Sequence, residues 1–206
     1  MRTSNTTKPS IYFTSDTHFG HTNIIRFCNR PFPSVPAMDE AMIERWNARV
    51  GDDDVIYHLG DFTLSNRNTA HRVLGRLRGH IKVLGYPWHH DRGWVPTTFG
   101  PSSYTSASGH AVEILAPLLT ISPEVDGRRQ PIALCHFPLG EWDRKHHGSW
   151  HLHGHSHGHH KGSGAMLDVG VDDHDYAPVA LIDLPAIMAP RMERKLDRRD
   201  WAQADA

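Results

Sequence analysis

Apolar and polar positions follow two distinct patterns along the chain. Short apolar runs, rich in β-branched and aromatic residues, predict buried strands. They lie at residues 11–14, 55–59, 81–84, 111–115, 118–121, 132–135, 166–171 and 179–182. Apolar residues at helical spacing predict helices at residues 23–27, 37–50 and 66–77, and the last shows the clearest periodicity.

The segments between these elements predict the remaining organisation. Residues 92–109 are rich in Gly, Pro, Ser and Thr and are expected to form a long loop, in part a lid. The runs at 111–115 and 118–121 are close enough in sequence to form a hairpin. Residues 1–10 are expected to be a flexible arm and 191–206 a charged tail, either a peripheral helix or disordered. Residues 11–190 then form a single domain.

A carboxylate or an imidazole follows the end of several predicted strands. In chain order these residues are Asp16, His18, Asp61, His89, His90, Asp91 and His136. Taken singly, each block also fits a capping Asp or a surface His. Their repetition after successive strands predicts one shared site, because open α/β sheets place ligands at the carboxyl ends of their strands. The three adjacent carboxylates at residues 52–54 are instead predicted to form a solvated turn, with cation binding as the alternative.

The stretch at residues 150–160, WHLHGHSHGHH, is dense in histidine, and the segment from residue 136 to 160 holds 9 of the chain's 18. Imidazole is the commonest side-chain ligand for Zn, Fe and Mn, so this density predicts metal binding. If the run is extended, its period of two directs His151, His153, His155 and His157 to one side. The alternatives are a surface tract that binds metal loosely and an expression tag. The interior position of the stretch argues against a tag.

Composition narrows the class of protein. A chain of 206 residues with 38% hydrophobic and 22% charged residues is typical of one globular domain. The net charge of -1 predicts neither a membrane surface nor a long nucleic acid as partner. No signal-peptide core or apolar run of about 18 residues occurs, so a cytoplasmic protein is expected. In that reducing compartment Cys28 and Cys135 are expected to be free, buried thiols.

Collected in order, the polar blocks read D-x-H at residues 16–18, G-D at 60–61, H-H-D at 89–91, a lone His136, and G-H-x-H at 154–157. This order resembles the signature of the calcineurin-like metallophosphoesterases, which reads DxH, GDxx, GNH(D/E), H and GHxH. The resemblance spans about residues 11 to 183, and four of the five blocks match. The runs SDTHFGHTN and LCHFPL are most similar to small bacterial and phage members. The resemblance implies an α/β fold in which two mixed β-sheets form a sandwich flanked by α-helices. The ligands would lie on loops at one edge.

The third block departs from the family pattern. Where the family has Gly-Asn-His-Asp, this chain has GYPWHHD at residues 85–91. One alignment places His89 in the Asn position, keeps His90 and Asp91 as the family's His-Asp, and treats residues 86–88 as an insertion. The alternative makes His89 the catalytic histidine and leaves the second metal short of a ligand.

The resemblance also implies a cofactor and a role for each residue. Two divalent cations are expected, Mn²⁺ first and Fe or Zn next, since mixed nitrogen and oxygen ligation suits these metals. Asp61 would bridge them. The implied ligands are Asp16, His18 and His157 for the first ion, and His89, His136 and His155 for the second. A water between the ions would be the nucleophile. His90, together with Asp91, would stabilise charge or protonate the leaving oxygen.

Other polar residues near these blocks have less definite roles. His21 and Arg92 are candidates for contacting the phosphate, with a solvated role as the alternative. The other histidines between residues 146 and 160 are expected to support the ligands or to lie on the surface. They are His146, His147, His151, His153, His159 and His160.

The expected activity is hydrolysis of small phosphodiesters, with cyclic nucleotides (2′,3′ or 3′,5′) as the leading substrate class. The substrates usual in this family point to nucleotides. So do the aromatic residues Tyr86, Trp88 and Trp142, because aromatic faces can stack on bases. Buried packing is the alternative role for these rings. A phosphomonoesterase such as a protein phosphatase, or a nuclease, is the alternative within the family. A metal-binding scaffold that has lost its chemistry is the alternative of another class.

Overall fold

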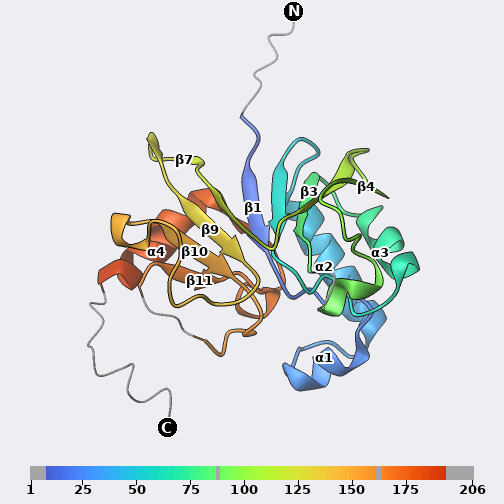
Figure 1. Cartoon of the computed structure of the whole chain (residues 1–206). Coiled ribbons are helices and arrows are strands. Elements are labelled where there is room, and N and C mark those ends of the chain that lie inside the picture. The colour runs from blue at the N-terminus through green and yellow to red at the C-terminus, as the bar shows by residue number, and fades with distance from the viewer. Residues whose placement is uncertain (1–7, 87–88, 161–163, 194–206) are drawn as a thin grey trace, which may run out of the picture.

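The structure is a computed structural model that describes residues 8–86, 89–160 and 164–193. It has two main β-sheets and a small two-stranded one (Figure 1). The strands of the first sheet, in spatial order, are β12 (Val179–Ala180), β1 (Ile11–Thr14), β2 (Val55–His58), β3 (His80–Leu84), β5 (Ala111–Leu115) and β4 (Gly100–Thr105). Those of the second are β11 (Met166–Asp168), β10 (Trp150–His153), β9 (Ile132–Cys135) and β6 (Leu118–Ile121). The small sheet pairs β7 (Glu124–Val125) with β8 (Arg128–Arg129).

Both main sheets are parallel inside and antiparallel at an edge. In the first, β1, β2, β3 and β5 are parallel, and the edge strands β12 and β4 run the other way. In the second, β9, β10 and β11 are parallel and β6 is antiparallel. The carboxyl ends of the parallel strands therefore gather at one edge of each sheet, where α/β folds bind ligands.

The sheets pack face to face, because alternate residues of the first sheet feed two different cores. In β1, Phe13 enters the core between the sheets, while Tyr12 packs against the core on the opposite face. From the second sheet, Leu134 and Leu152 reach the same inter-sheet core. Strands that bury both faces read as continuous apolar runs, which is the pattern seen in the sequence. The predicted α/β sandwich is confirmed.

Four α-helices complete the described fold: α1 (Thr22–Phe27), α2 (Val35–Arg49), α3 (Arg67–Leu74) and α4 (Leu184–Glu193). The first three contribute apolar residues to the core on the outer face of the first sheet. Two of these helices have side-chain N-caps. Ser34 accepts a hydrogen bond from Ala37 N, and Asn66 accepts hydrogen bonds from the backbone at the start of α3. By contrast, α4 directs Leu184 and Met188 into the inter-sheet core.

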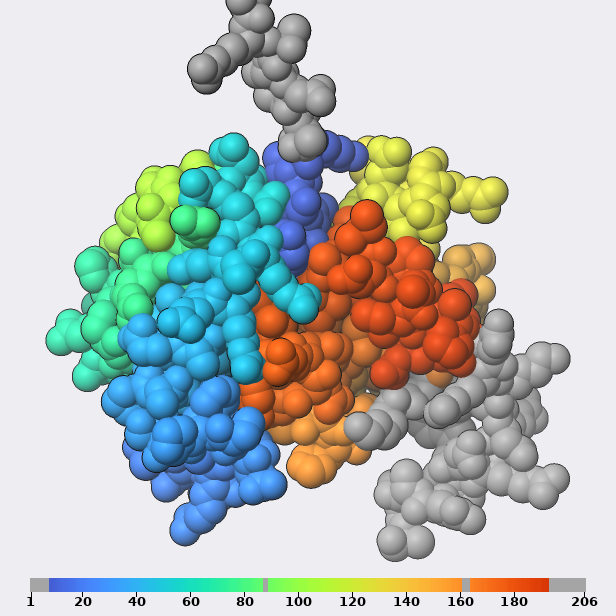
Figure 2. Space-filling model, turned by 180° about the vertical axis from the view of Figure 1, so that it is seen from behind, coloured from blue at the N-terminus to red at the C-terminus, as the bar shows by residue number. Residues whose placement is uncertain are grey.

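The described residues also form four 3₁₀ turns: η1 (His90–Gly93), η2 (Lys145–His147), η3 (Val171–Asp173) and η4 (Leu181–Asp183). The C-terminal part of the chain closes against the N-terminal part, as β12 pairs with β1 and Ser15 bridges to Gly170. From behind, the blue N-terminal and red C-terminal surfaces lie side by side (Figure 2). This closure brings residues near both ends of the domain into one neighbourhood.

Two local predictions were wrong. The runs at 111–115 and 118–121 form strands but no hairpin, because β5 joins the first sheet and β6 the second. The predicted loop at 92–109 contains the edge strand β4, whose polar sequence hides it since an edge strand buries little. For the histidine run, the condition of an extended backbone holds only in its first part. β10 ends at His153, and the residues that follow turn away.

Other predictions concern the ends of the chain and the thiols. The arm at 1–10 and the tail at 191–206 lie mostly outside the described residues, apart from a short stretch before β1 and the last turn of α4. Cys28 is half-buried and Cys135 buried, and both are free. No helix among the described segments is long and apolar enough to cross a membrane.

Candidate metal centre

Every residue predicted as a metal ligand follows the carboxyl end of a parallel strand. Asp16 and His18 follow β1, Asp61 follows β2, and His89 follows β3. From the second sheet, His136 directly follows β9, and the G-H-x-H block follows β10. The two sheets thus contribute ligands from opposite sides of one site.

The structure gathers these side chains into two sets. Asp16, His18 and His157 form one, and Asp61, His89, His136 and His155 form the other. Within each set, one donor atom per residue lies within 4.8 Å of every other. These are the two groupings that the family resemblance implies.

Asp61 links the two sets. Its Oδ1 lies 2.7 Å from His89 Nδ1, and its Oδ2 lies 3.4 Å from His136 Nε2. The same Oδ2 lies 3.6 Å from Nε2 of His18, a member of the other set. Burial raises the pKa of a carboxyl, but His136, His18 and His89 together hold the pKa of Asp61 well below its ordinary value. Asp61 is therefore a buried anion with imidazoles on several sides.

Several donor atoms of the sets are buried without a hydrogen-bond partner. They are Asp16 Oδ1 and both ring nitrogens of His18 and of His136. Leaving such atoms unpaired costs free energy, typically about 1–3 kcal/mol each. Burial also lowers the pKa of His18 well below its ordinary value, so its imidazole is neutral, the form that binds metal. The unpaired Asp16 oxygen and the neutral His18 imidazole fit the divalent ions that the sequence implies.

The backbone at the ligands is held in a rare conformation. Asp16, His18, Asp61, His155 and His157 have φ values of 57°, 51°, 56°, 69° and 46°. Ten non-glycine residues in the described chain have positive φ, and these five are half of them. Left-handed non-glycine residues cost free energy, and such strain gathers at functional sites. The strain supports a binding role for these blocks.

Two glycines let the loops approach one another. A Cβ on Gly154 would overlap the side chains of Ser15 and Asp16, and one on Gly60 would lie 2.9 Å from His136 Nδ1. The close approach allows His155 N to donate a hydrogen bond to Asp16 Oδ2 at 2.9 Å. The glycines of the G-D and G-H-x-H blocks therefore serve packing between loops, which explains their place in the motif.

An ion pair that the sequence analysis missed supports the first set. Asp172 Oδ2 lies 2.7 Å from His157 Nδ1, and Arg30 Nε donates to Asp172 Oδ1 at 2.7 Å. Arg30 also donates to the backbone carbonyls of Asp16 and Thr17. Although burial lowers the pKa of an imidazole, Asp172 together with Cys28 and Asp16 raises the pKa of His157 to about 10. Metal binding at His157 must displace this proton, so it depends on pH.

The altered third block separates its three residues. His89 belongs to the second set, in the place that the first alignment gave it. His90 lies outside both sets, with Nε2 3.9 Å from Asp61 Oδ2 and 42% of its side chain exposed. Asp91 is fully buried and accepts hydrogen bonds from Phe62 N, Thr63 N and Trp94 Nε1. With these hydrogen bonds Asp91 holds the Asp61 loop in place, and the catalytic role expected for it stays a prediction. Residues 87–88 of the inserted segment lie outside the described residues.

The two candidate phosphate contacts differ in their setting. The ring centroid of His21 lies 5.4 Å from that of His18, and His21 Nδ1 is buried without a partner. Arg92 is exposed and next to the third block. His21 is thus beside the ligands, while Arg92 faces solvent.

Of the aromatic residues expected near the site, Tyr86 and Trp142 are engaged in packing, and Trp88 lies outside the described residues. Tyr86 is 3% exposed, and its hydroxyl donates to Pro117 O and accepts from His136 N. Trp142 packs on His151 and donates to Ser149 O. Phe137, which the sequence analysis did not select, is the aromatic ring beside the second set. Its centroid lies 4.7 Å from that of His155 and 4.9 Å from that of His136.

The other histidines between residues 146 and 160 divide into a buried and an exposed group. His151 and His153 are fully buried, whereas His146, His147, His159 and His160 are exposed. Leu139 N donates a hydrogen bond to His151 Nε2. The proton of the His151 ring is therefore on Nδ1, which donates to Ala133 O. His151 therefore joins β10 to the loop after β9 and is not a ligand.

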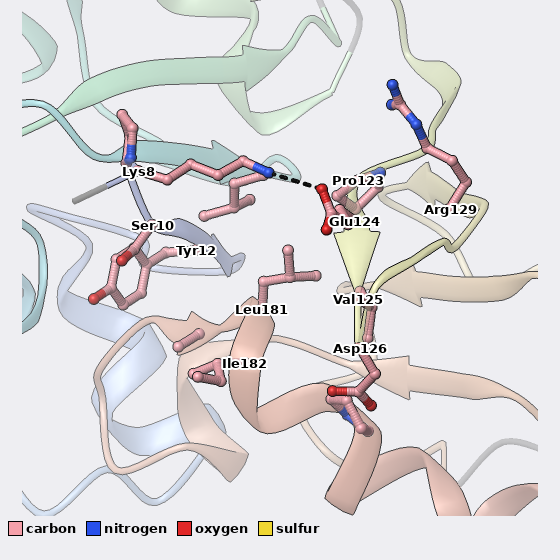
Figure 3. A pocket seen from close by; sticks show the side chains of 14 residues that line it. Lys8, Ser10, Tyr12, Pro123, Glu124, Val125, Asp126, Arg129, Leu181 and Ile182 are labelled. Carbon is pink, nitrogen blue, oxygen red and sulfur yellow. Dashed lines mark hydrogen bonds and ion pairs between the residues drawn. The ribbon is translucent and has the colours of Figure 1, made fainter. Parts of the chain in front are cut away.

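A cavity of about 610 Å³ lies away from this centre (Figure 3). The labelled Tyr12, Leu181 and Val125 line it, and an ion pair between Lys8 and Glu124 crosses its rim. None of the ligand candidates is among its lining residues. The cavity is therefore separate from the predicted chemistry.

Comparison with known proteins gives two similarities and no family assignment. No family model matches the chain. A Methanocaldococcus jannaschii protein named "Uncharacterized protein MJ1445" is 46% identical over 76 residues, which are 36% of this chain and 43% of that protein. The match therefore spans less than half the relative's length. A crystal structure of "the Protein of Unknown Function AQ665" from Aquifex aeolicus superposes with a TM-score of 0.63 at 20% identity. It covers 87% of this chain and 100% of that one. This second similarity shows a shared fold.

Proposed function

We propose that this chain is a binuclear metal-dependent phosphodiesterase of the calcineurin-like metallophosphoesterase type. The observation that carries the proposal is the convergence of two donor sets, from strand ends of both sheets, on the buried carboxylate of Asp61. The order of the motif blocks along the sequence supports it independently.

The two sets would hold two divalent ions, Mn²⁺ first and Fe or Zn next. Asp16, His18 and His157 would hold one, and His89, His136 and His155 the other, with Asp61 between them. When bound, such a pair lowers the pKa of water and neutralises charge on a phosphate. Six of these seven residues are buried or half-buried, and His155 is exposed. The surrounding protein therefore holds most of the donors in place before a metal binds.

His90 is the residue best placed for proton transfer. It lies outside both sets, faces both Asp61 and solvent, and has its ring centroid 5.6 Å from that of His18. Partial burial lowers the pKa of His90, and the neighbouring His89 and His136 lower it further. A lower pKa makes the imidazolium a stronger acid toward a leaving oxygen.

The proposed substrates are small diesters, with cyclic nucleotides first. Among the described residues, Arg30 is committed to Asp172 and to backbone carbonyls, which leaves the exposed Arg92 as the arginine beside the third block. Binding of a long polyanion needs many phosphate contacts, so this sparse charge favours a small substrate. The preference for a base rests on the family resemblance, because Tyr86 and Trp142 are used in packing.

The deciding experiment is turnover of bis-p-nitrophenyl phosphate by the metal-stripped chain after addition of Mn²⁺, Fe²⁺ or Zn²⁺. We expect activity with at least one metal, and a loss of several orders of magnitude in Asp61→Asn. Asp126→Asn, in an exposed turn, is the matched control and should remain active. If the chain binds two equivalents of metal but turns over no substrate with any of them, it is a metal-binding scaffold without catalytic activity. A panel of cyclic nucleotides, linear nucleotides and monoesters then identifies the substrate class.

A further inference from the structure

The amino ends of the parallel strands in the first sheet hold a second group of metal-ligand side chains. Asp53 lies two residues before β2, His80 begins β3, and His110 directly precedes β5. One donor atom from each lies within 4.8 Å of the other two. Since β2, β3 and β5 are adjacent and parallel, this group lies at the edge of the sheet opposite the candidate metal centre.

Hydrogen bonds hold the three loops of this group together. Gly79 N donates to Ser108 Oγ at 3.0 Å, and Ser108 Oγ donates to Asp52 Oδ1 at 2.8 Å. His80 N donates to Asp54 O at 2.7 Å. The backbones also approach closely, because a Cβ on Gly79 would lie 2.9 Å from Asp54 O. The backbone positions of the three donor residues are therefore fixed by the fold, while their side chains can still turn.

The carboxylates of Asp52 and Asp54 accept hydrogen bonds within the described part of the protein, whereas that of Asp53 does not. Asp54 accepts hydrogen bonds from Ser10 N and Gly51 N, and Asp52 accepts from Ser108. Asp53 is exposed and accepts no hydrogen bond from the described residues. Of the three adjacent carboxylates, one thus remains available as a ligand, beside two histidines.

The two imidazoles face one another. The ring centroids of His80 and His110 are 3.4 Å apart and the ring planes differ by 19°. Partial burial lowers the pKa of His80, and His110 lowers it further. The neutral ring is the form that binds metal. An ion lies in the plane of each imidazole that binds it, so the stacked rings must swing apart to share one.

We propose that Asp53, His80 and His110 form a mononuclear site for a divalent transition ion, Zn²⁺ in the first place. Two imidazoles and one carboxylate are a ligand set of Zn²⁺ sites that keep a further position for water. Ca²⁺ and Mg²⁺ are excluded by their preference for all-oxygen sites. The ion would join the starts of three strands that are far apart in sequence.

The test compares Zn²⁺ stoichiometry and affinity by equilibrium dialysis in the full chain without a histidine tag. We expect His80→Ala and His110→Ala to bind one equivalent fewer than the unaltered chain. His146→Ala, whose side chain is 86% exposed, is the matched control and should bind as many. Because the result is a difference between variants, it holds whether or not the centre around Asp61 binds metal.

A second variant guards against loss of folding. Asp53→Asn changes an exposed side chain, so the variant should fold. Its affinity for the Zn²⁺ ion at this site should nevertheless fall at least roughly 10–100-fold, as it does on loss of a group that supports a metal. Asp126→Asn is its control. If Asp53→Asn, His80→Ala and His110→Ala all bind Zn²⁺ as the unaltered chain does, the site does not exist. An equivalent that His146→Ala also loses would likewise overturn the assignment, because it would reflect binding to surface histidines.

Discussion

The carboxylate of Asp172 holds His157 on one side and Arg30 on the other. Its Oδ2 lies 2.7 Å from His157 Nδ1, and its Oδ1 accepts from Arg30 Nε at the same distance. The Arg30 side chain is fully buried, and it also binds the carbonyl of Asp16. One ion pair therefore positions both the G-H-x-H and the D-x-H loops.

Asp172→Asn should weaken the first metal and destabilise the fold. Removal of a carboxylate that orients a ligand His typically costs about 10–100-fold in metal affinity. Breaking a buried ion pair costs about 3–5 kcal/mol, because Arg30 keeps its charge. Competition dialysis and urea unfolding measure the two effects. Asp175→Asn, with an 84% exposed side chain, is the control, and equal behaviour of the two variants would contradict this role.

His89→Ala and His90→Ala should fail in different ways. If His89 fills the second set, its loss should remove one metal preferentially, and excess Mn²⁺ should restore part of the activity by mass action. His90→Ala should keep both metals and lose rate, by about 10²–10⁴-fold for a general acid. The loss should be smaller with a p-nitrophenyl leaving group, which scarcely needs a proton. Calorimetric metal titration beside the kinetics separates the two, and the reverse pattern would exchange the assignments.

Asp91→Ala should reduce stability more than it alters chemistry. It would leave three buried donors without an acceptor, at about 1–3 kcal/mol each. Urea unfolding of the metal-free protein measures the loss, and His90→Ala is the control from the same loop. An unchanged free energy of unfolding with a large loss of rate would instead make Asp91 catalytic.

Acid should destabilise the metal-free protein partly through His151. Burial lowers the pKa of His151 to about 4, while the unfolded chain has the ordinary pKa of about 6.5. The contribution to stability is therefore full above pH ~6.5. It is lost as pH falls toward 4, by at most about 3 kcal/mol, since the unfolded chain takes up the proton first.

Gln at position 151 can keep both hydrogen bonds but does not titrate. The free energy of unfolding of His151→Gln should therefore fall less between about pH 7.5 and about pH 5 than that of the unaltered chain. Urea titrations in the presence of a chelator measure the slopes. Equal slopes would show that His151 does not contribute to the acid sensitivity.

The strands and the ligand blocks were predictable because each is determined by a short stretch of contiguous sequence. Apolar runs such as residues 55–59 mark strands buried on both faces, and a polar residue just after each marks the sheet edge. The edge strand β4 was missed because an edge strand needs few apolar residues. The hairpin between β5 and β6 was wrong because proximity in sequence does not determine which sheet a strand joins.

The supporting residues of the site could not be read from the sequence. Arg30 and Asp172 are separated by 142 positions, and only the folded chain brings them together. The same holds for Asp53, His80 and His110, which belong to no motif. By contrast, the rare backbone at Asp61 or His155 follows from ordinary residue types whose neighbours force the turn, so composition carries no trace of it.

The two residues between β5 and β6, Ala116 and Pro117, carry the chain from one sheet to the other. Four of the seven candidate ligands precede this crossing, Asp16, His18, Asp61 and His89, and the other three follow it. Neither half of the chain holds a complete donor set for either ion. A bound metal pair would therefore cross-link the two halves of the chain. During synthesis, both ions could bind only after the second half had left the ribosome and packed against the first.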